Sequence, residues 1–339
     1  SNCFTAFGDA RNCKTPRDMK NITIQSESTD RSTDDVLSWL HYLAPDAIVN
    51  KYFDTCEIRK IKIELSNRES LKIALNETAE TYNRAYWYRR GRFVFRSADD
   101  KHFLNGVEHK IAGEYLTPLL KFINGNIHSN GINKFSDNEI EKLDMLHACV
   151  GLSISIPDTL ITDNLGDVKK FLEQHGSIIC KPAKNPFINT TVGSASIRFS
   201  GPTELITRAN VDELPETFIA CLFQKYIPKK IEIRSFYLGG QFYSMAIFSQ
   251  SNPKTQIDFR NYDHQKPNRV VPYTLPVSLR NKLQKLMTRL EMSSGSFDLI
   301  LTPDNKYFFL EVNPIGQFQW VSRNCNYFLE KLIATHLLK

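Results

Sequence analysis

The chain has 339 residues, of which 41% are hydrophobic and 24% are charged, and its formal net charge is +6. This composition excludes a disordered or fibrous protein, and the length allows more than one hydrophobic core. The modest positive charge favours acidic peptides or nucleotides as ligands, and it is too dispersed for a nucleic-acid-binding arm. No apolar run of about 18 residues and no signal peptide is visible, so we expect a cytoplasmic protein without a membrane span.

The seven cysteines indicate neither a metal site nor a disulfide framework. Their number is odd, and their spacing contains no Cys-x-x-Cys or other metal-ligand pattern. Cys149, Cys180 and Cys221 fall in apolar helix or strand patterns, where a thiol acts as a small hydrophobic side chain. We therefore expect reduced cysteines with a structural role.

The start of the chain differs in pattern from the rest. Residues 1–18 are polar, show little periodicity and precede Met19, so we interpret them as an extension or a fused segment. Beyond Met19 the sequence predicts a strand at 21–24, a helix capped by residues 32–35 and a strand at 47–49. Strand, helix and strand in this order indicate an α/β domain with parallel pairing.

The segment 85–92 is unusual because three aromatic residues precede two arginines and a glycine. We interpret it as a strand. Aromatic and basic residues also occur together in nucleic-acid-binding surfaces, but one short segment is a weak indication of that function. A helix is predicted to follow at 102–123.

Two lysines lie in the next predicted elements. Residues 136–139 (Ser-Asp-Asn-Glu) have the pattern of a capping box that opens a helix, which carries Lys142 and ends at Gly151. Residues 177–182 predict a buried strand with Lys181 at its end. A lysine is a point charge suited to phosphate oxygens, although a lysine taken alone is more often an ordinary surface residue.

The region after residue 217 predicts a strand, a joint and a hairpin. An apolar strand runs into a polar joint at 224–227. Two alternating strands around Gly239 and Gly240 then have the pattern of a β-hairpin. Glu232 and Arg234 are two residues apart on the first of these strands, so they share one face of the sheet. On spacing alone, a charged pair on an open sheet face is as consistent with these two residues as a functional site.

Two apolar segments near the end of the chain, 296–300 and 308–314, flank a polar turn and predict adjacent strands. Glu311 and Asn313 are two residues apart and project from the same face, and the turn brings Asp298 toward them. Two carboxylates and an amide oxygen are ligands typical of Mg²⁺, which completes its shell with water and substrate phosphates. The pattern therefore indicates a nucleotide site.

Asp298, followed by Glu311-Val312-Asn313-Pro314, resembles the metal-binding end of ATP-grasp ligases, which join a carboxylate to an amine or hydroxyl through an acyl phosphate. A strand at 156–162 with a Pro-x-Thr pattern is similar to another part of that family. The resemblance implies an α/β (α+β) ATP-grasp fold with three subdomains, with ATP between the middle and C-terminal subdomains and Mg²⁺ as a cofactor.

The resemblance also implies roles for individual residues. These are metal binding by Asp298, Glu311 and Asn313, phosphate binding by Lys142 and Lys181, adenine binding at Gln224, Lys225, Tyr226 and Ile227, ribose binding by Glu232, and stabilisation of the transferred phosphoryl group by Arg234. Many relatives have Glu at the place of Gln224, so the role of the backbone there is better supported than that of the side chain.

The residues 87–91 (Trp-Tyr-Arg-Arg-Gly), the polar segment 250–269 and the Gly-Gln-Phe at 316–318 narrow the resemblance. They are similar to the ATP-grasp maturases of ribosomally made peptides, the graspetide or microviridin-type ligases, and within these to the grasp-with-spasm branch. The resemblance covers about residues 21 to 339. It implies that the enzyme phosphorylates Asp or Glu side chains of a precursor peptide, made of a leader and an acidic core. A Ser or Thr hydroxyl or a Lys amine of the same peptide then forms a macrocyclic ester or amide.

A cationic loop suits a substrate that presents carboxylates, so Arg260 and Arg269 are candidates for orienting the peptide acid or its acyl phosphate. Both arginines are also compatible with a solvated loop. No nucleic acid or membrane is expected as a partner, and the relatives imply a possible homodimer.

The predicted organisation is an extension at 1–18, an N-terminal α/β domain at 19–130, a central ATP-grasp subdomain at 131–225 and a C-terminal subdomain with the Mg²⁺ site at 226–339. Two alternatives to a peptide maturase stay open. One is an ATP-grasp ligase for a small amino acid or a protein C-terminus, which would accept free amino acids. The other is a catalytically silent ATP- or peptide-binding module, which would bind without forming ADP.

Overall fold

The computed structural model of the chain describes residues 20–67, 71–76, 85–95, 106–127, 131–182, 188–192, 195–199, 203–261 and 263–339. The predicted extension at 1–18 and Tyr262, in the polar segment 250–269, lie outside these residues. The chain forms two compact units, Ser1–Lys134 with Glu330–Lys339, and Phe135–Leu329. The boundary after residue 134 lies close to the predicted domain boundary at 130, and the sequence does not indicate that the last ten residues group with the first unit.

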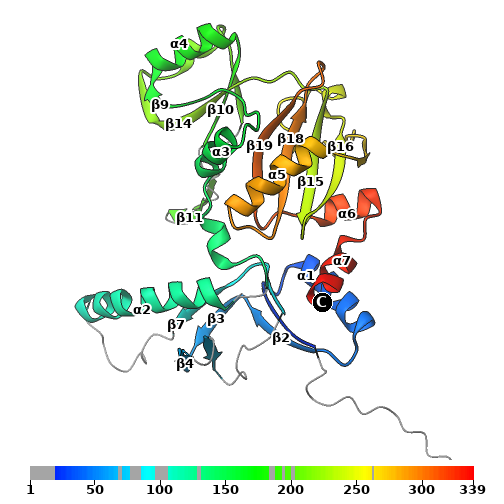
Figure 1. Ribbon diagram of the computed structural model, residues 1–339. Helices are drawn as coiled ribbons and strands as arrows, with labels where there is room; N and C mark the ends of the chain where they lie inside the picture. Colours follow the sequence, from blue (N-terminus) through cyan, green and yellow to red (C-terminus); the bar gives the residue numbers. More distant parts are fainter. Residues whose placement is uncertain are drawn as a thin grey trace, which may run out of the picture. The chain divides into compact units, whose positions relative to one another are not determined.

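The first unit is built on a parallel sheet with the strand order β2-β1-β6-β8. Its strands are β1 (Asn21–Ser26), β2 (Ile48–Phe53), β6 (Ala85–Tyr88) and β8 (Gly131–Ile132). Helix α1 (Arg31–Leu43) connects β1 to β2, as the strand-helix-strand pattern predicts (Figure 1). The helix begins earlier than predicted, because the Asp30 side chain accepts from the N–H of Ser32 and caps it.

Smaller elements complete the first unit. They are the parallel pair β3 (Thr55–Ile58) and β7 (Arg92–Phe95), the antiparallel pair β4 (Ile61–Glu64) and β5 (Lys72–Leu75), and the helices α2 (Gly106–Asn126) and α7 (Leu329–Leu337). No helix among the residues that the structure describes is long and apolar enough to cross a lipid bilayer.

The aromatic and basic segment belongs to the interior of this unit. The side chains of Tyr86, Trp87 and Tyr88 are buried, and Arg89 is only 5% exposed. The Nε of Arg89 lies 2.9 Å from the Asp30 carboxylate, which also caps α1. The rings are therefore part of the core and not an exposed surface for stacking bases, so the weak indication of nucleic-acid binding is not supported.

The second unit contains an antiparallel sheet with the order β13-β10-β14-β9. Its strands are β9 (Thr159–Asn164), β10 (Ile178–Lys181), β13 (Glu204–Ile206) and β14 (Thr217–Lys225), and a separate hairpin is formed by β11 (Ile188–Val192) and β12 (Ala195–Phe199). Helix α4 (Leu165–His175) packs on one face of the four-stranded sheet through Val168 and Leu172. The opposite face carries Lys181 and Gln224, because side chains alternate along each strand.

A five-stranded antiparallel sheet with the order β17-β16-β15-β18-β19 forms the rest of the second unit. Its strands are β15 (Ile231–Leu238), β16 (Gln241–Ile247), β17 (Val270–Tyr273), β18 (Ser294–Leu301) and β19 (Tyr307–Asn313), and the helices around it are α3 (Lys142–Gly151), α5 (Val277–Arg289) and α6 (Gln319–Cys325), with short 3₁₀ helices η1 (Phe135–Glu139), η2 (Val211–Glu213) and η3 (Ser249–Ser251). The predicted hairpin is confirmed: Gly239 and Gly240 have φ angles of 53° and 87°, which favour glycine.

Alternation along the strands separates a core face from a polar face of this sheet. Ile233, Phe297 and Leu299 belong to a hydrophobic core that includes Leu283 and Leu286 of α5. Figure 1 shows α5 lying across this sheet. Residues that alternate with these core residues along the same strands, including Glu232 and Asp298, point to the other face and line a pocket there. Fixing the register of β15 and β18 therefore also fixes the side on which the polar residues gather.

The start of α3 differs from the prediction. Residues 136–139 do not open the helix; they lie in the 3₁₀ helix η1, where Asn138 Nδ2 donates to the Phe135 carbonyl at 2.9 Å. Helix α3 begins at Lys142, with Glu141 as its N-cap residue and no side-chain capping bond. The local hydrogen bonds of Asp and Asn side chains favour tight turns as well as helix caps, which explains the error.

The cysteines of the described residues are free thiols, as expected: Cys56, Cys149, Cys180, Cys221 and Cys325. Burial raises the pKa of both Cys149 and Cys180 to about 12, so these two are protonated at neutral pH.

Gly316 gives a test of the packing around the end of β19. A methyl group added there would lie 2.5 Å from Ser296 Oγ and 3.0 Å from the Asn313 carbonyl oxygen. Gly316→Ala is therefore expected to destabilise the protein by about 1–3 kcal/mol in denaturant unfolding. The cost should shrink in a Ser296→Gly background, and an equal cost in both backgrounds would contradict this packing.

Candidate functional site

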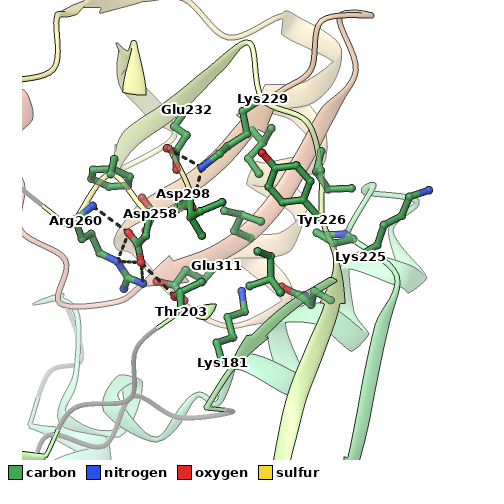
Figure 2. A pocket seen from close by; sticks show the side chains of 18 of the residues that line it. Lys181, Thr203, Lys225, Tyr226, Lys229, Glu232, Asp258, Arg260, Asp298 and Glu311 are labelled. Atoms are coloured by element: carbon green, nitrogen blue, oxygen red, sulfur yellow. Dashed lines mark hydrogen bonds and ion pairs between the residues drawn. The ribbon is translucent and has the colours of Figure 1, made fainter. Parts of the chain in front are cut away.

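One pocket in the second unit collects most of the side chains that the sequence nominates (Figure 2). The nominated residues that line it are Lys142, Lys181, Gln224, Lys225, Tyr226, Ile227, Glu232, Arg260, Asp298 and Glu311. Three further nominated residues, Arg234, Asn313 and Arg269, are not among the residues that line it. Arg234 and Asn313 form hydrogen bonds with the carboxylates of the pocket. Arg269 forms none with them among the residues that the structure describes.

The two carboxylates face each other on neighbouring strands. Asp298 on β18 is paired in register with Glu311 on β19, beside an irregularity in the pairing. Asn313 Nδ2 donates to Asp298 Oδ2 and to Glu311 Oε1, at 3.3 Å in each case. The three oxygen-bearing side chains thus converge at one place on the sheet.

Two cations hold these carboxylates. Lys142 Nζ lies 2.9 Å from Glu311 Oε2, and only 10% of the lysine side chain is exposed. Arg234 Nη1 donates to both oxygens of Asp298, at 2.7 and 2.6 Å. Such pairing is needed because an unpaired charge at this depth would be strongly unfavourable.

The two acids respond differently to these surroundings. Burial opposes ionisation of Glu311, but the charge and hydrogen bond of Lys142, with Lys181 and Arg260 nearby, lower its pKa to about 2. Burial raises the pKa of Asp298 above its usual range, although Arg234 opposes this shift. The site thus holds a firmly ionised Glu311 and an Asp298 whose charge depends on its cationic neighbours.

The donor set fits Mg²⁺. Asp298 and Glu311 supply carboxylate oxygens, and a rotation of the Asn313 amide would turn its oxygen toward the same place. Among the residues that the structure describes, no group of three or more His, Cys, Asp or Glu side chains forms a complete metal cage. Mg²⁺ does not require one, because it commonly uses one or two carboxylates together with water and phosphates.

Lys181 approaches the carboxylates from the other sheet, at the end of β10 (Figure 2). Burial, and then the positive charge of Lys142, lower the pKa of Lys181 to about 8, while Glu311 opposes the shift. Two ammonium groups therefore act on the same space, which is a favourable place for an anion.

Two backbone N–H groups of the joint at the end of β14 already donate hydrogen bonds within the protein. The N–H of Lys225 donates to Asp158 and that of Tyr226 to Ser177, at 2.9 and 3.0 Å. Gln224 is 2% exposed, and its Nε2 donates to Thr159 Oγ1. A planar ligand at this joint would have to use the carbonyl groups of residues 224–227 and the N–H of Ile227. Among the residues that the structure describes, this N–H donates to none.

The sequence patterns do not identify Lys229, whose side chain bonds two residues that line one end of the pocket. Its Nζ donates to Glu232 Oε1 at 3.0 Å and to the Ile257 carbonyl at 2.9 Å (Figure 2). Ser249 Oγ donates to the same Glu232 oxygen at 2.6 Å. Burial raises the pKa of Glu232, although Lys229 opposes this shift. The lysine follows the joint directly, but no local pattern distinguishes it from the exposed Lys230.

The two loop arginines differ in position. Arg260 lines the pocket, where Asp258 holds it with four hydrogen bonds. Arg269 is exposed, and its guanidinium lies over the ring of Phe248 at 5.1 Å. The structure thus brings Arg260 to the carboxylates and places Arg269 at the edge of the sheet.

The pKa of Lys181 would make the binding of an anion beside it depend on pH. Only the protonated amine attracts a phosphate, so ADP affinity should be constant below about pH 8 and fall by up to about tenfold per pH unit above it. Isothermal titration calorimetry of ADP with Mg²⁺ between about pH 7.5 and 9.5 measures this dependence.

Lys181→Arg is the matched variant, because a guanidinium stays charged throughout that range. Its affinity should remain flat. The same decline in both proteins would show that another group titrates.

Comparison with known proteins identifies the fold. No protein-family model matches the chain, and no curated protein matches its sequence. Among solved structures, it is similar to a RiPP-associated ATP-grasp ligase of Chryseobacterium gregarium in complex with ADP, and a leader and core peptide, with a TM-score of 0.73, 21% identity and coverage of 94% of this chain and 97% of that one. It is similar to the macrocyclase MdnC of Microcystis aeruginosa, bound with the precursor peptide MdnA, with a TM-score of 0.66, 24% identity and coverage of 94% and 99%.

A third similar structure is the ATP-grasp ligase PsnB complexed with minimal precursor, Mg and ADP, with a TM-score of 0.65, 14% identity and coverage of 94% and 97%. These likenesses extend over nearly the whole of both chains in each comparison. The chain therefore has the ATP-grasp fold.

Proposed function

We propose that the chain is an ATP-dependent ligase that closes macrocycles in a ribosomally made precursor peptide. It would phosphorylate Asp or Glu side chains of the peptide and join them to Ser or Thr hydroxyls as esters, or to Lys amines as amides. The observation that carries the proposal is the pair Asp298 and Glu311, which lies between four cationic side chains on a fold shared with peptide-bound ligases.

The pocket has a suitable chemical group for each part of ATP. The joint at 224–227 would meet the adenine, chiefly through carbonyl groups and the Ile227 N–H. Glu232 would accept from ribose hydroxyls with its second oxygen, since Oε1 already accepts from Lys229 and Ser249. Lys142 and Lys181 would bind phosphate oxygens as point charges.

Asp298, Glu311 and Asn313 would hold Mg²⁺, which supplies charge neutralisation to phosphate oxygens when it is bound. Lys142 and Arg234 now neutralise these carboxylates. Both cations would then be released in part to act on the nucleotide phosphates. Binding thus exchanges one set of charge pairs for another within a buried site.

In the first chemical step, a carboxylate oxygen of the peptide attacks the γ-phosphorus of ATP and ADP leaves. Arg234 and Arg260 would stabilise the charge on the transferred phosphoryl oxygens, because phosphoryl transfer depends mainly on positioning and charge neutralisation. In the second step, a hydroxyl or amine attacks the acyl carbon, phosphate leaves and the nucleophile gives up one proton. Each ring closure removes the elements of one water from the peptide.

The cationic end of the pocket suits an acidic core peptide. Arg260 is 49% exposed and faces the carboxylates, so it is accessible to a substrate acid. The exposed Arg269 would contact a peptide only farther out along the loop. Leader binding elsewhere on the enzyme would raise the effective concentration of the core at the site.

The test is mass spectrometry of short acidic peptides encoded beside this gene, after incubation with the protein, ATP and Mg²⁺. An ATP-dependent loss of one water per ring, reversed by mild base for esters, is the expected result. ADP release only with free amino acids would instead favour a ligase for small substrates. Nucleotide binding without ADP formation would favour a silent binding module.

Glu311→Gln keeps the side-chain volume but removes the ionised metal ligand. ADP formation should fall by at least about 10³-fold. The protein should still fold, but its thermal unfolding temperature should fall, because Lys142 loses the carboxylate that it pairs with. Glu213→Gln makes the same chemical change on an exposed 3₁₀ turn and should leave activity unchanged. Full ADP release by Glu311→Gln would show that the metal assignment is wrong.

A further inference from the structure

A lysine and a glutamate form a buried ion pair at one end of the pocket, and the proposed reaction uses only the glutamate. The side chain of Lys229 is 3% exposed and that of Glu232 is 7% exposed, and Lys229 Nζ lies 3.0 Å from Glu232 Oε1. Both residues line the pocket. Replacing a buried ion pair by apolar side chains of similar size often costs no stability, so stability alone does not explain Lys229.

The pair leaves one oxygen of Glu232 open to the pocket. Oε1 accepts two hydrogen bonds, from Lys229 at 3.0 Å (Figure 2) and from Ser249 Oγ at 2.6 Å. Among the residues that the structure describes, Oε2 accepts none. Because two donors hold Oε1, the carboxylate has a fixed direction, and Oε2 is an acceptor that is already oriented.

Lys229 also reaches the loop between β16 and β17. Its Nζ donates to the Ile257 carbonyl at 2.9 Å, and Ile257 lines the pocket. The bonds to Ile257 and to Glu232 come from one ammonium group. A single buried charge therefore holds both the carboxylate and the loop.

Hydrogen bonds within this loop join residues 249–257 into one unit, which we call the segment 249–257. Thr255 Oγ1 donates to the Ser249 carbonyl at 3.0 Å, and Gln250 Nε2 donates to the Gln256 carbonyl at 3.1 Å. The side chains of Ser249 and Thr255 are buried. The two ends of the segment are therefore tied to each other.

The ion pair bonds the segment 249–257 at both ends, through Ser249 and through Ile257. A ligand hydroxyl that donates to Glu232 Oε2 would stabilise the ionised carboxylate. Hydrogen bonds to a charged group are stronger than neutral ones, and bonds in a chain polarise and strengthen one another. Such a hydroxyl would therefore strengthen the bonds that Lys229 and Ser249 make to Oε1, and the segment would be held more firmly.

The charge of Glu232 depends on Lys229. Burial raises the pKa of Glu232, the charge of Lys229 and the hydrogen bonds from Ser249 and Lys229 oppose this rise, and Asp258 adds to it. Burial and then the charge of Glu232 raise the pKa of Tyr226, so this phenol stays neutral beside the carboxylate. Without Lys229, the carboxylate would bind a proton more readily and become a weaker acceptor.

We propose that Lys229 is a positioning residue that aims Glu232 Oε2 at the sugar hydroxyls of the bound nucleotide and transmits their presence to the segment 249–257. The inference rests on the proposed function, because that function supplies the nucleotide. Lys229 would act through Glu232 and the Ile257 carbonyl, and not on the reacting atoms. The sugar would thus set how firmly one wall of the pocket is held.

The experiment uses two nucleotides that differ only in the sugar. They are ADP and its dideoxy analogue, which lacks both ribose hydroxyls, each with Mg²⁺. Isothermal titration calorimetry gives the ratio of their affinities. Hydrogen exchange, followed by mass spectrometry of peptides from the segment 249–257, measures how firmly that segment is held with each nucleotide.

The variants are Lys229→Met, Ser249→Ala and Glu232→Gln. Lys230→Met is the matched control, because it makes the same change at the next residue, where the exposed side chain donates to Asn305. Thermal unfolding of each variant checks the fold.

Wild type should bind ADP about 10- to 100-fold more tightly than the dideoxy analogue, and only ADP should slow exchange in the segment 249–257. Glu232→Gln and Lys229→Met should each bring this ratio to within about threefold of unity, and ADP should no longer slow exchange in Lys229→Met. Ser249→Ala should lower the ratio by about two- to fivefold. Lys230→Met should match wild type.

The pH dependence separates positioning from a general loss of structure. The ratio in Lys229→Met should recover in part between about pH 6.5 and about pH 8.5, because the carboxylate of Glu232 then ionises without its partner. The ratio in wild type should stay flat, because Lys229 keeps the carboxylate ionised and titration of Lys181 affects both nucleotides equally.

An unchanged ratio in Lys229→Met overturns the inference, as does ADP-dependent protection of the segment 249–257 that persists in this variant. A ratio in Lys229→Met that does not recover at the higher pH shows a general loss of structure and also overturns it. If Lys229→Met does not fold, an unchanged ratio in Ser249→Ala overturns the inference. A wild-type ratio near unity overturns the inference alone, because both nucleotides then bind, whereas failure of wild type to bind ADP overturns the proposed function.

Discussion

The structure of the site depends on one electrostatic constraint: a buried carboxylate and a largely buried one lie opposite each other on neighbouring strands. Asp298 and Glu311 are paired in register on β18 and β19, and neither would be tolerated there without cations. Arg234 comes from the adjacent strand β15, and Lys142 from the first turn of α3. The cost of burying the acids thus explains why two separate elements deliver positive charge to the same place. Under the proposed function, the same groups could exchange partners with a metal ion and nucleotide phosphates.

The same arrangement links the two sheets of the second unit to one pocket. The five-stranded sheet supplies the acids and Glu232, while the four-stranded sheet supplies Lys181 and the joint after β14. Alternation along the strands leaves one face of the five-stranded sheet apolar and packed on α5, and the other polar. Hydrogen bonds from Lys229 and Thr203 to the loop between β16 and β17 then close the pocket. A ligand between the sheets would therefore be contacted from both sides.

The sequence predicts those parts of the site that depend on local spacing. Asp298, Glu311 and the Gly239-Gly240 hairpin follow from strand periodicity and turn chemistry, and these elements are present. The sequence does not predict Asp258, Thr203 or Lys229, because their contacts join residues that are 28 and 55 positions apart. The capping box before α3 was wrong because the same side chains also stabilise a tight turn. Exposure of Arg269 likewise depends on tertiary packing that charge alone does not reveal.

We propose that the carboxylate pair and the two lysines form a joint site for a divalent metal and nucleotide phosphates. Mn²⁺ is a paramagnetic substitute for Mg²⁺, and the relaxation of the phosphorus NMR signals of bound ADP measures its distance from each phosphate. We predict that Mn²⁺ binds more tightly when ADP is present and strongly relaxes the phosphorus signals, and that both effects are lost in Asp298→Asn. Tight ADP binding with no relaxation by Mn²⁺, or relaxation that persists in Asp298→Asn, would contradict it.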